Sequence, residues 1–378
     1  MADRESEVIA RLASGVGAVD AARWDSLAGG DPFLSHAFLS ALEDSGSVGP
    51  GTGWTPAPIL VEEEARLLAA APAYLKTHSQ GEYVFDHGWV EAWMNAGGRY
   101  YPKLQIAVPF TPVPGLRLLG SKPQQLLTAA EAVVVQNDLS SAHITFIDEA
   151  GASEAKRRDW VIRHGIQFHW FNRGYLTFDE FLAALSSRKR KAIRRERAAA
   201  REALQFRELR GSEIGRAEWD AMWAFYQDTG SRKWGRPYLT RAFFDLVSEG
   251  MGDRVLLFLA YRGSRPIAGA LNFVGADSLY GRYWGCIEEV RFLHFELSYY
   301  QAVEWAIDHG LSTVQAGAQG EHKIARGYEP VITRSAHFLP NQGFREAVAD
   351  FVEAERLGIA NEIEWLRRDL PYRSASSE

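Results

Sequence analysis

Residues 314–330 read VQAGAQGEHKIARGYEP and combine three glycines with a Glu-His-Lys triplet. Glycine adopts backbone angles that other residues disfavour, so this segment is able to turn tightly or to approach a ligand closely. Glu321, His322 and Lys323 supply a carboxylate base, a group that titrates near neutral pH and a positive charge. The preceding residues 299–310 have the spacing of an amphipathic helix that ends at glycine. The sequence therefore predicts a helix, a short strand and a polar turn at the rim of a site, with an ordinary surface loop as the alternative.

The composition is that of a globular protein large enough for two domains. The chain has 378 residues, of which 46% are hydrophobic, and a net charge of −6, which gives no overall bias toward nucleic acid or membrane. Cys286 is the single cysteine, so neither an intramolecular disulfide nor a zinc site of the cysteine type is expected. No apolar run approaches the roughly 18–20 residues of a membrane span, and the charged N-terminus lacks a secretory pattern. We therefore expect a cytoplasmic protein.

Strand and helix patterns alternate along the chain in two successive sets. Residues 31–150 alternate strands and helices around a mixed sheet. Further on, residues 255–262, 266–274 and 278–284 have the pattern of a three-stranded meander, and a long helix is predicted over 342–368. The layout is similar in the two halves.

This layout predicts an α/β (α+β) fold with duplicated domains, each a mixed, mostly antiparallel sheet flanked by helices. The predicted divisions are residues 1–150, residues 151–345 with a basic helix over 181–204, and a C-terminal helix and tail over 346–378.

The most basic segment is residues 186–201, SSRKRKAIRRERAAAR, with eight Lys or Arg residues and one glutamate. On a helix, Arg190, Arg194, Arg197 and Arg201 lie three or four residues apart and share a face. Like charges so placed repel one another unless an anion neutralises them, so the run indicates a phosphate-bearing ligand. A solvated helix face is the alternative. The predicted ligand-binding residues are Arg190, Lys191 and Arg194.

A second basic cluster occupies residues 229–238, TGSRKWGRPY, which are predicted to form a loop. Arg232 and Arg236 lie there among aromatic residues, an arrangement that suits a planar or phosphorylated group. A surface turn between helices is the alternative.

Other candidate side chains lie in three aromatic-rich segments, residues 83–103, 164–175 and 281–286. Aromatic stripes belong to the core more often than to a pocket, so a structural role is the alternative for each. The candidates are Asp86, Lys103, His169, Asn172, Arg173, Arg282, Tyr283 and Trp284.

Several common site motifs are absent from the sequence. There is no G-x-x-x-x-G-K-[ST], no G-x-S-x-G and no G-x-G-x-x-G after a predicted strand. An Arg-x-x-Gly-x-Gly turn ahead of a helix, the phosphate-binding turn of acetyl-CoA-dependent acetyltransferases, is also missing, with Gly285 the nearest approach to it.

Long pieces of the chain resemble a bacterial family of predicted N-acyltransferases related to the Fem-type peptidoglycan aminoacyl transferases. These pieces are GEYVFDHGW, YYPKLQIAVPFTPV, QFHWFNRGY, FLAALSSRKRKAIRRER, FLHFELSYYQAVEWA and GAQGEHKIARGYEP, within residues 30–345. The resemblance implies two tandem domains of the GNAT acyltransferase fold. It also implies transfer of an amino acid from aminoacyl-tRNA to the amine of a UDP-linked cell-wall precursor.

The resemblance carries over to particular residues of this chain. Lys323 matches the family's lysine in a glycine-flanked turn, Thr229 and Arg232 match its Thr-x-x-Arg loop, and residues 190–197 are similar to its basic helix. Glu321 and His322 depart from the pattern, since Fem enzymes favour an aromatic residue ahead of the lysine. A separate coiled-coil arm is not evident.

We therefore hypothesise an N-acyltransferase in which an amine attacks an acyl carbonyl. Lys323 would stabilise the oxyanion, and His322 or Glu321 would remove the amine's proton. The arginines of residues 181–204 are expected to face the same hollow as Lys323 and, with Arg232, to hold phosphates. We expect no metal and no tightly bound cofactor.

The donor and partners stay open at this point. The donor would be aminoacyl-tRNA or acyl-CoA. The partner would be a phosphate-bearing small molecule or a nucleotide-linked substrate, and tRNA is one candidate. A non-catalytic binding module for an anionic cell-wall precursor or RNA is the alternative. The sequence does not indicate an oligomeric state.

Overall fold

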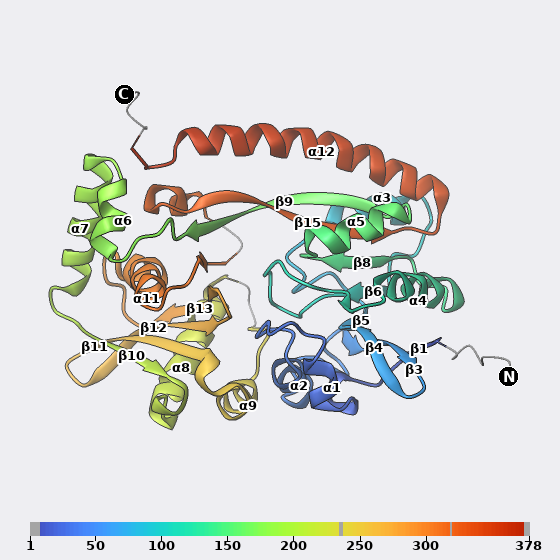
Figure 1. The fold of residues 1–378 in the computed structure, drawn as a ribbon, viewed down its shortest axis with the longest axis horizontal. Helices are drawn as coiled ribbons and strands as arrows, with labels where there is room; N and C mark the ends of the chain where they lie inside the picture. The colour runs from blue at the N-terminus through green and yellow to red at the C-terminus, as the bar shows by residue number, and fades with distance from the viewer. Residues whose placement is uncertain (1–7, 234–236, 318–319, 374–378) are drawn as a thin grey trace, which may run out of the picture. The chain divides into compact units, whose positions relative to one another are not determined.

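The computed structural model describes residues 8–233, 237–317 and 320–373, except for the side chains of 231–233. The chain forms two compact units, Met1–Gly165 with Ile332–Ala360 and Ile166–Val331 with Asn361–Glu378. The boundaries between the units fall within three elements, which Figure 1 labels: β9 (Val161–Phe171), β15 (Glu329–Phe338) and α12 (Gln342–Arg368). Because β9 and β15 belong to both units, residues 151–165 and 332–345 join the first unit instead of the second predicted domain.

The first unit contains two sheets. One has the order β1-β3-β4-β7 with antiparallel pairing, and the other contributes the order β15-β8-β6-β5-β2. Helix α4 packs on strands of both sheets, and its buried Leu126, Leu127, Ala130 and Val134 join their core. The strands are β1 (Val8–Leu12), β2 (Trp54–Pro56), β3 (Ile59–Glu63), β4 (Arg66–Ala71), β5 (Ala73–Lys76), β6 (Lys103–Ile106), β7 (Leu119–Gly120) and β8 (Ala142–Thr145). The helices are η1 (Val16–Ala18), α1 (Ala21–Asp25), α2 (His36–Asp44), α3 (His87–Asn95), α4 (Pro123–Gln136) and α5 (Glu149–Arg157).

The second unit is built on a sheet of order β10-β11-β12-β13-β14-β9. Its pairs are antiparallel except for β13 with β14, which are parallel. The strands are β10 (Gln205–Arg210), β11 (Val255–Arg262), β12 (Arg265–Val274), β13 (Ser278–Cys286) and β14 (Thr313–Gln315). The helices are α6 (Phe178–Ala184), α7 (Ser187–Arg201), η2 (Gly211–Glu213), α8 (Arg216–Lys233), α9 (Arg241–Met251), η3 (Gly252–Arg254), α10 (Leu293–Phe295), the π-helical η4 (Glu296–Tyr300), α11 (Gln301–Asp308) and η5 (Glu321–Arg326).

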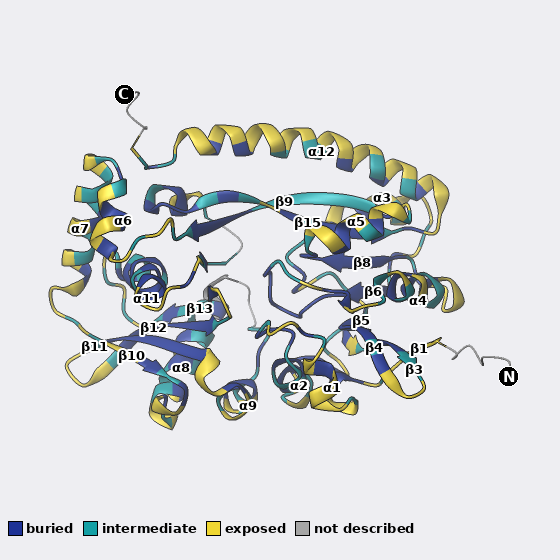
Figure 2. Ribbon diagram, in the orientation of Figure 1, coloured by how far each residue is buried: buried dark blue, intermediate teal, exposed yellow. Residues whose placement is uncertain are grey.

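Helices cover both faces of the sheet in the second unit, and side chains along each strand point alternately to one face and the other. Leu256, Phe258 and Ala260 of β11 join a core with α6, η4 and α11, and the intervening residues face the other side of the sheet. On that other side α8 crosses β12 and β13 closely. A Cβ at Gly285 of β13 would lie 2.1 Å from the carbonyl oxygen of Phe225, so α8 reaches its position only over a glycine. The central strands β11 and β12 are buried almost throughout, whereas much of α12 is exposed (Figure 2).

The structure agrees with the predicted meander and the predicted terminal helix, and it departs from the sequence expectation at two helices. The helix expected over residues 177–204 is broken between α6 and α7. Leu185 is extended there, fully buried and bridged to Tyr372, so core burial outweighs local helix propensity. The loop expected over 229–238 was wrong in its first half, because α8 continues to Lys233.

Candidate functional site

The parallel strands β13 and β14 separate within the second unit. They pair over three positions only, from Ser278 opposite Thr313 to Tyr280 opposite Gln315. Strand β13 then continues to Cys286 against β12, and the described pairings give it no partner on its β14 side beyond Tyr280. Among the described strands β13 thus has no further partner on this edge, although Gln315 and Ala316 still lie beside Gly281, and an extended ligand would add here as a strand.

The turn η5 follows β14 and carries the Glu-His-Lys triplet. Gly320 precedes it with φ of 120°, and a Cβ there would lie 2.5 Å from the ring of His322. No other residue fits this position without strain. Glu321 and His322 are exposed, whereas Lys323 is only 1% exposed. The turn therefore directs the lysine inward and leaves the other two members of the triplet at the surface.

The amine of Lys323 lies close to the point where the two strands part. Its Nζ donates to the carbonyl oxygen of Gly317, two residues after the end of β14, at 2.7 Å. Burial, and to a smaller extent the positive charge of Arg282 on β13, lower the pKa of Lys323 to about 7. Burial and then Lys323 itself lower the pKa of His169 to about 4. These three predicted residues, from η5, β13 and β9, thus lie close enough for Lys323 to feel the charge of Arg282 and for His169 to feel that of Lys323.

Aromatic side chains of the helical segment after β13 surround His322. The hydroxyl of Tyr299 lies 2.9 Å from His322 Nε2, and burial raises the pKa of that hydroxyl. The centroid of the His294 ring lies 5.3 Å from the centroid of the Tyr299 ring and 5.0 Å from that of the Trp284 ring. His294 projects from α10 and Tyr299 from the π-helical η4. Short π-helical turns are often found at functional sites.

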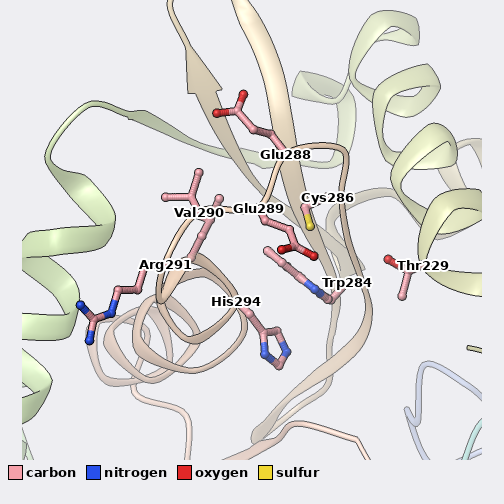
Figure 3. A pocket seen from close by; sticks show the side chains of 9 residues that line it. Thr229, Trp284, Cys286, Glu288, Glu289, Val290, Arg291 and His294 are labelled. Atoms are coloured by element: carbon pink, nitrogen blue, oxygen red, sulfur yellow. The ribbon is translucent and has the colours of Figure 1, made fainter. Parts of the chain in front are cut away.

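A cavity of about 590 Å³ lies on the other side of Trp284 and His294. Figure 3 shows the carboxylate of Glu289 turned toward the Trp284 ring, whereas Glu288 and Arg291 extend away from it. The cavity is lined by Thr229, Trp284, Cys286, Glu288, Glu289, Val290, Arg291, Leu293 and His294. Trp284 and His294 therefore form a wall shared by the cavity and the ring cluster around His322.

The arginines of α7 are neutralised within the protein on the side that packs against η4. Arg197 and Arg201 both pair with Glu296, whose side chain is fully buried, at 3.1 and 2.6 Å. Arg197 also pairs with Glu304. This part of the predicted anion-binding face was wrong, because carboxylates about 100 residues further along the chain supply the compensating charge.

The three predicted ligand-binding residues of α7 face a different environment from Lys323. Arg194 pairs with the exposed Asp179 at 2.8 Å, and the side chains of Arg190 and Lys191 make no ion pair with the described residues. Arg194 also lines a second cavity of about 400 Å³. The lining of that cavity is Thr177, Phe178, Asp179, Leu182, Arg194, Arg197, Glu304 and Asp308, without Lys323. Neither of these two cavities contains both Lys323 and the α7 arginines, as the shared hollow would require.

Three further predicted residues have local roles in the second unit. Asn172 Oδ1 accepts hydrogen bonds from the amides of Gly174 and Tyr175, which closes a turn after β9. Arg173 pairs with Glu329 and lies over the ring of Tyr372. Tyr283 packs its ring against Tyr226 of α8, on the opposite side of β13 from Trp284.

Lys103 and Asp86 belong to the first unit and form an internal ion-pair network. Lys103 is fully buried and donates to Ser79 Oγ, Glu82 Oε2 and Asp86 Oδ2 at 2.8, 2.8 and 2.6 Å. Asp86 Oδ2 also accepts from the hydroxyl of Tyr100 at 2.7 Å. Despite the cost of burial, the charge of Lys103 holds the pKa of Asp86 well below its usual range. These contacts give both residues a structural role within the unit.

The basic side chains of the 229–238 segment lie outside the described residues. The position of Arg232 falls within the bounds of α8, but its side chain is not described, and Arg236 is not described at all. Within the described ranges, no group of three or more His, Cys, Asp or Glu side chains is placed to hold a metal ion. A separate finding is that no helix among those residues is both long and apolar enough to cross a membrane.

Two contributors to the site were not predicted from the sequence. They are Tyr299, whose hydroxyl contacts His322, and Arg326, which ends the turn and donates to the backbone of His322. Phe295 and Tyr299 are four residues apart on a helix, and this spacing is the signal that could have indicated an aromatic face toward the turn.

Comparison with known families identifies the chain at the family level. A model of the FemAB-like family, described as peptidoglycan biosynthesis/recognition, matches residues 15–374. The chain belongs to the FemAB-like family. A comparison of this FemAB-like chain with curated proteins finds no match. The family resemblance noted in the sequence is thereby confirmed.

Solved structures show how widely the fold of this FemAB-like chain is shared. It is similar to FemX, with a TM-score of 0.53 and 13% identity over 87% of this chain and 97% of that chain. A similar match is the C-terminal domain of a putative lysylphosphatidylglycerol synthetase from Agrobacterium fabrum, with a TM-score of 0.52, 10% identity and 87% and 95% coverage. A conserved protein of unknown function from Bacteroides thetaiotaomicron matches with a TM-score of 0.52, 8% identity and 88% and 99% coverage. The predicted tandem GNAT-like fold is confirmed.

Proposed function

We propose that this FemAB-like chain is an acyltransferase that moves an acyl or aminoacyl group from an activated donor to an amine. The proposal is carried by the position of the Lys323 amine. It is buried beside Arg282 and His169, next to the first residues after β14, where β13 and β14 part. An extended donor lying along the open edge of β13 would bring its carbonyl to this amine.

The reaction would proceed through a tetrahedral oxyanion. The nitrogen of the neutral acceptor amine forms a bond to the donor carbonyl carbon, and the bond from that carbon to the donor oxygen or sulfur then breaks. Lys323 in its protonated form stabilises the negative oxygen, and a buried site strengthens this interaction. His322 receives the proton that the attacking amine loses, and the leaving oxygen or sulfur takes up a proton as it departs.

Two features support His322 over Glu321 as the proton acceptor. Both residues are exposed, but the His322 ring is held by the Tyr299 hydroxyl at its Nε2 and by close contact with Gly320. When Nε2 carries the ring proton, Nδ1 is the remaining acceptor. A fixed base is more effective than a mobile one, because its orientation is already set before the reaction.

The cavity beyond Trp284 favours an aminoacyl donor over acyl-CoA. Glu289 turns its carboxylate toward Trp284, so the ammonium of an aminoacyl group would be attracted to that part of the cavity, whereas Glu288 extends away and pairs with Arg262. The face of Trp284 adds a surface that also favours a cation. Phosphates of a nucleotide-linked or RNA-linked substrate would instead lie near Arg190 and Lys191 on α7.

The family description points to an acceptor among cell-wall precursors, although a peptide or a small amine would fit the same chemistry. A phosphate-bearing or nucleotide-linked partner, a cytoplasmic location and the lack of a tightly bound cofactor stay predictions.

A donor comparison tests the proposed function. The purified chain is incubated with a UDP-linked muropeptide and either bulk tRNA charged with radiolabelled amino acids or radiolabelled acetyl-CoA. We expect a new amide on the muropeptide from aminoacyl-tRNA and little or none from acetyl-CoA. Product from acetyl-CoA alone would overturn the donor preference. The binding-module alternative would be supported by a different result. Both donors would bind saturably, but neither would give product with the muropeptide or with any of a set of simple amines.

A further inference from the structure

The guanidinium of Arg326 joins the turn η5 to the helices beside it. Arg326 is the last residue of η5 and is 7% exposed. Its Nη1 donates to the backbone carbonyl of His322 at 2.8 Å, and its Nη2 donates to Glu196 Oε2 at 2.9 Å. Its Cζ lies 3.4 Å from the centroid of the Phe295 ring. One side chain therefore connects the backbone of the turn with α7 and with α10.

Glu196 extends this connection to the π-helical segment η4. The carboxylate oxygen that accepts from Arg326 also accepts from the hydroxyl of Tyr300. Glu196 is the one acidic residue in the basic run of α7, and its neighbour Arg197 anchors the same helix to Glu296. The turn is thus attached to a helix whose own position is set by buried ion pairs.

The position of Lys323 depends on this attachment. The Lys323 amine has one hydrogen bond to the described residues, to Gly317, which lies in the same short segment as the turn itself. Within the turn, Arg326 donates to His322 O, one residue before Lys323, and the same guanidinium carries the connection to Glu196 on α7, outside the segment. Loss of either partner of the Arg326–Glu196 pair would leave the other charge buried and uncompensated. The turn would then move to let water reach that charge.

We propose that Arg326 and Glu196 are positioning residues that hold the His322–Lys323 turn in the geometry required for acyl transfer. The inference rests on the proposed function for its catalytic meaning. The mechanical coupling between α7 and the turn is measurable without any substrate.

The experiment follows the titration of Lys323 by NMR in protein labelled with ¹³C and ¹⁵N at lysine. The chain has eight lysines, so the Lys323 signal is assigned by its loss in Lys323→Arg. The variants are Arg326→Gln, Glu196→Gln and the conservative Arg326→Lys. Arg173→Gln is the matched control, because it removes an exposed ion pair to Glu329, three residues beyond Arg326.

Arg326→Gln and Glu196→Gln are expected to raise the pKa of Lys323 from about 7 toward its ordinary value of 10.5, since water gains access to Nζ. Arg326→Lys keeps a positive charge but cannot make both bonds at once, so it should show a smaller shift. Arg173→Gln should leave the titration unchanged. In the transfer assay, kcat is expected to fall on the order of 100-fold in Arg326→Gln, with KM changed less, as for a misplaced catalytic group.

An unchanged Lys323 titration in both Glu196→Gln and Arg326→Lys would overturn the inference, even if Arg326→Gln failed to fold. A shift equal to theirs in Arg173→Gln would also overturn it, because the effect would then not depend on the Arg326–Glu196 pair. A shift in the expected variants together with no transfer by the wild-type chain from any donor would reject the proposed function and keep the coupling.

Discussion

Replacing Lys323 by methionine should stabilise the protein at neutral pH, and the gain should shrink as the pH rises. Methionine has a similar length and no charge, so it removes the cost of placing an ammonium in this buried site. Burial, with the Arg282 charge, lowers the pKa of Lys323 from 10.5 to about 7. Between these values the unfolded chain binds the lysine proton and the folded chain does not. Raising the pH through this window therefore favours the folded wild-type protein.

The size of the effect follows from the width of that window. Each pH unit contributes about 1.4 kcal/mol to the free energy of unfolding, with an upper limit of about 5 kcal/mol across the whole range. Below pH 7 the lysine is protonated in both states, so the difference between the two proteins should be constant there. Other groups titrate in both proteins and cancel in the comparison, including the buried Lys76, whose pKa burial also lowers to about 7.

Urea unfolding of both proteins at half-unit steps from pH 6 to pH 10 measures this difference. Lys191→Met, an exposed substitution on α7, controls for the general effect of removing a lysine. A stability difference that does not change between pH 7 and pH 10 would refute the reasoning. A wild-type protein that gains stability relative to Lys323→Met as the pH falls would show that the ammonium is favoured by a partner, against the present account.

Three further predictions concern other parts of the fold and site. Gly285→Ala should cost about 1–3 kcal/mol in thermal unfolding, because the new methyl group would lie 2.1 Å from the carbonyl of Phe225; an unchanged melting temperature would mean that α8 shifts freely. Lys103→Met should cost about 3–5 kcal/mol, because it leaves two buried carboxylates without their main cation, whereas Arg99→Gln, at an exposed ion pair, should change little. Cys286, the single cysteine, lines the cavity, so bound aminoacyl-tRNA should slow its alkylation by N-ethylmaleimide, as followed by intact mass; an unchanged rate at saturation would place the donor elsewhere.

Local patterns predicted much of the second unit. The strands β11 to β13 and the helix α12 lie where period and turn residues placed them, because each is a long segment with a strong pattern. The glycine-flanked turn with Lys323 was also predicted, because three glycines close to charged residues indicate a tight turn. The break at Leu185 did not, because it depends on a bridge to Tyr372, close to the other end of the chain.

The charged residues were harder to assign, because their partners are distant in sequence. Arg197 was expected to bind an anionic ligand, but Glu296 and Glu304 neutralise it from another helix. Lys103 was expected to bind substrate, but Glu82 and Asp86 enclose it. A run of basic residues shows that a segment is positively charged, but it does not show which acidic residues pack against it. Burial and charge compensation are therefore seen only in the tertiary structure.

The role of Lys323 as the transfer centre is tested most directly by single-turnover transfer from aminoacyl-tRNA to a UDP-linked muropeptide, comparing the wild-type chain with Lys323→Ala at equal donor occupancy. The account predicts that the alanine variant folds, binds the donor as the wild type does, and forms amide at a rate lower by on the order of 100-fold or more. Amide formation at the wild-type rate in Lys323→Ala would contradict the central claim.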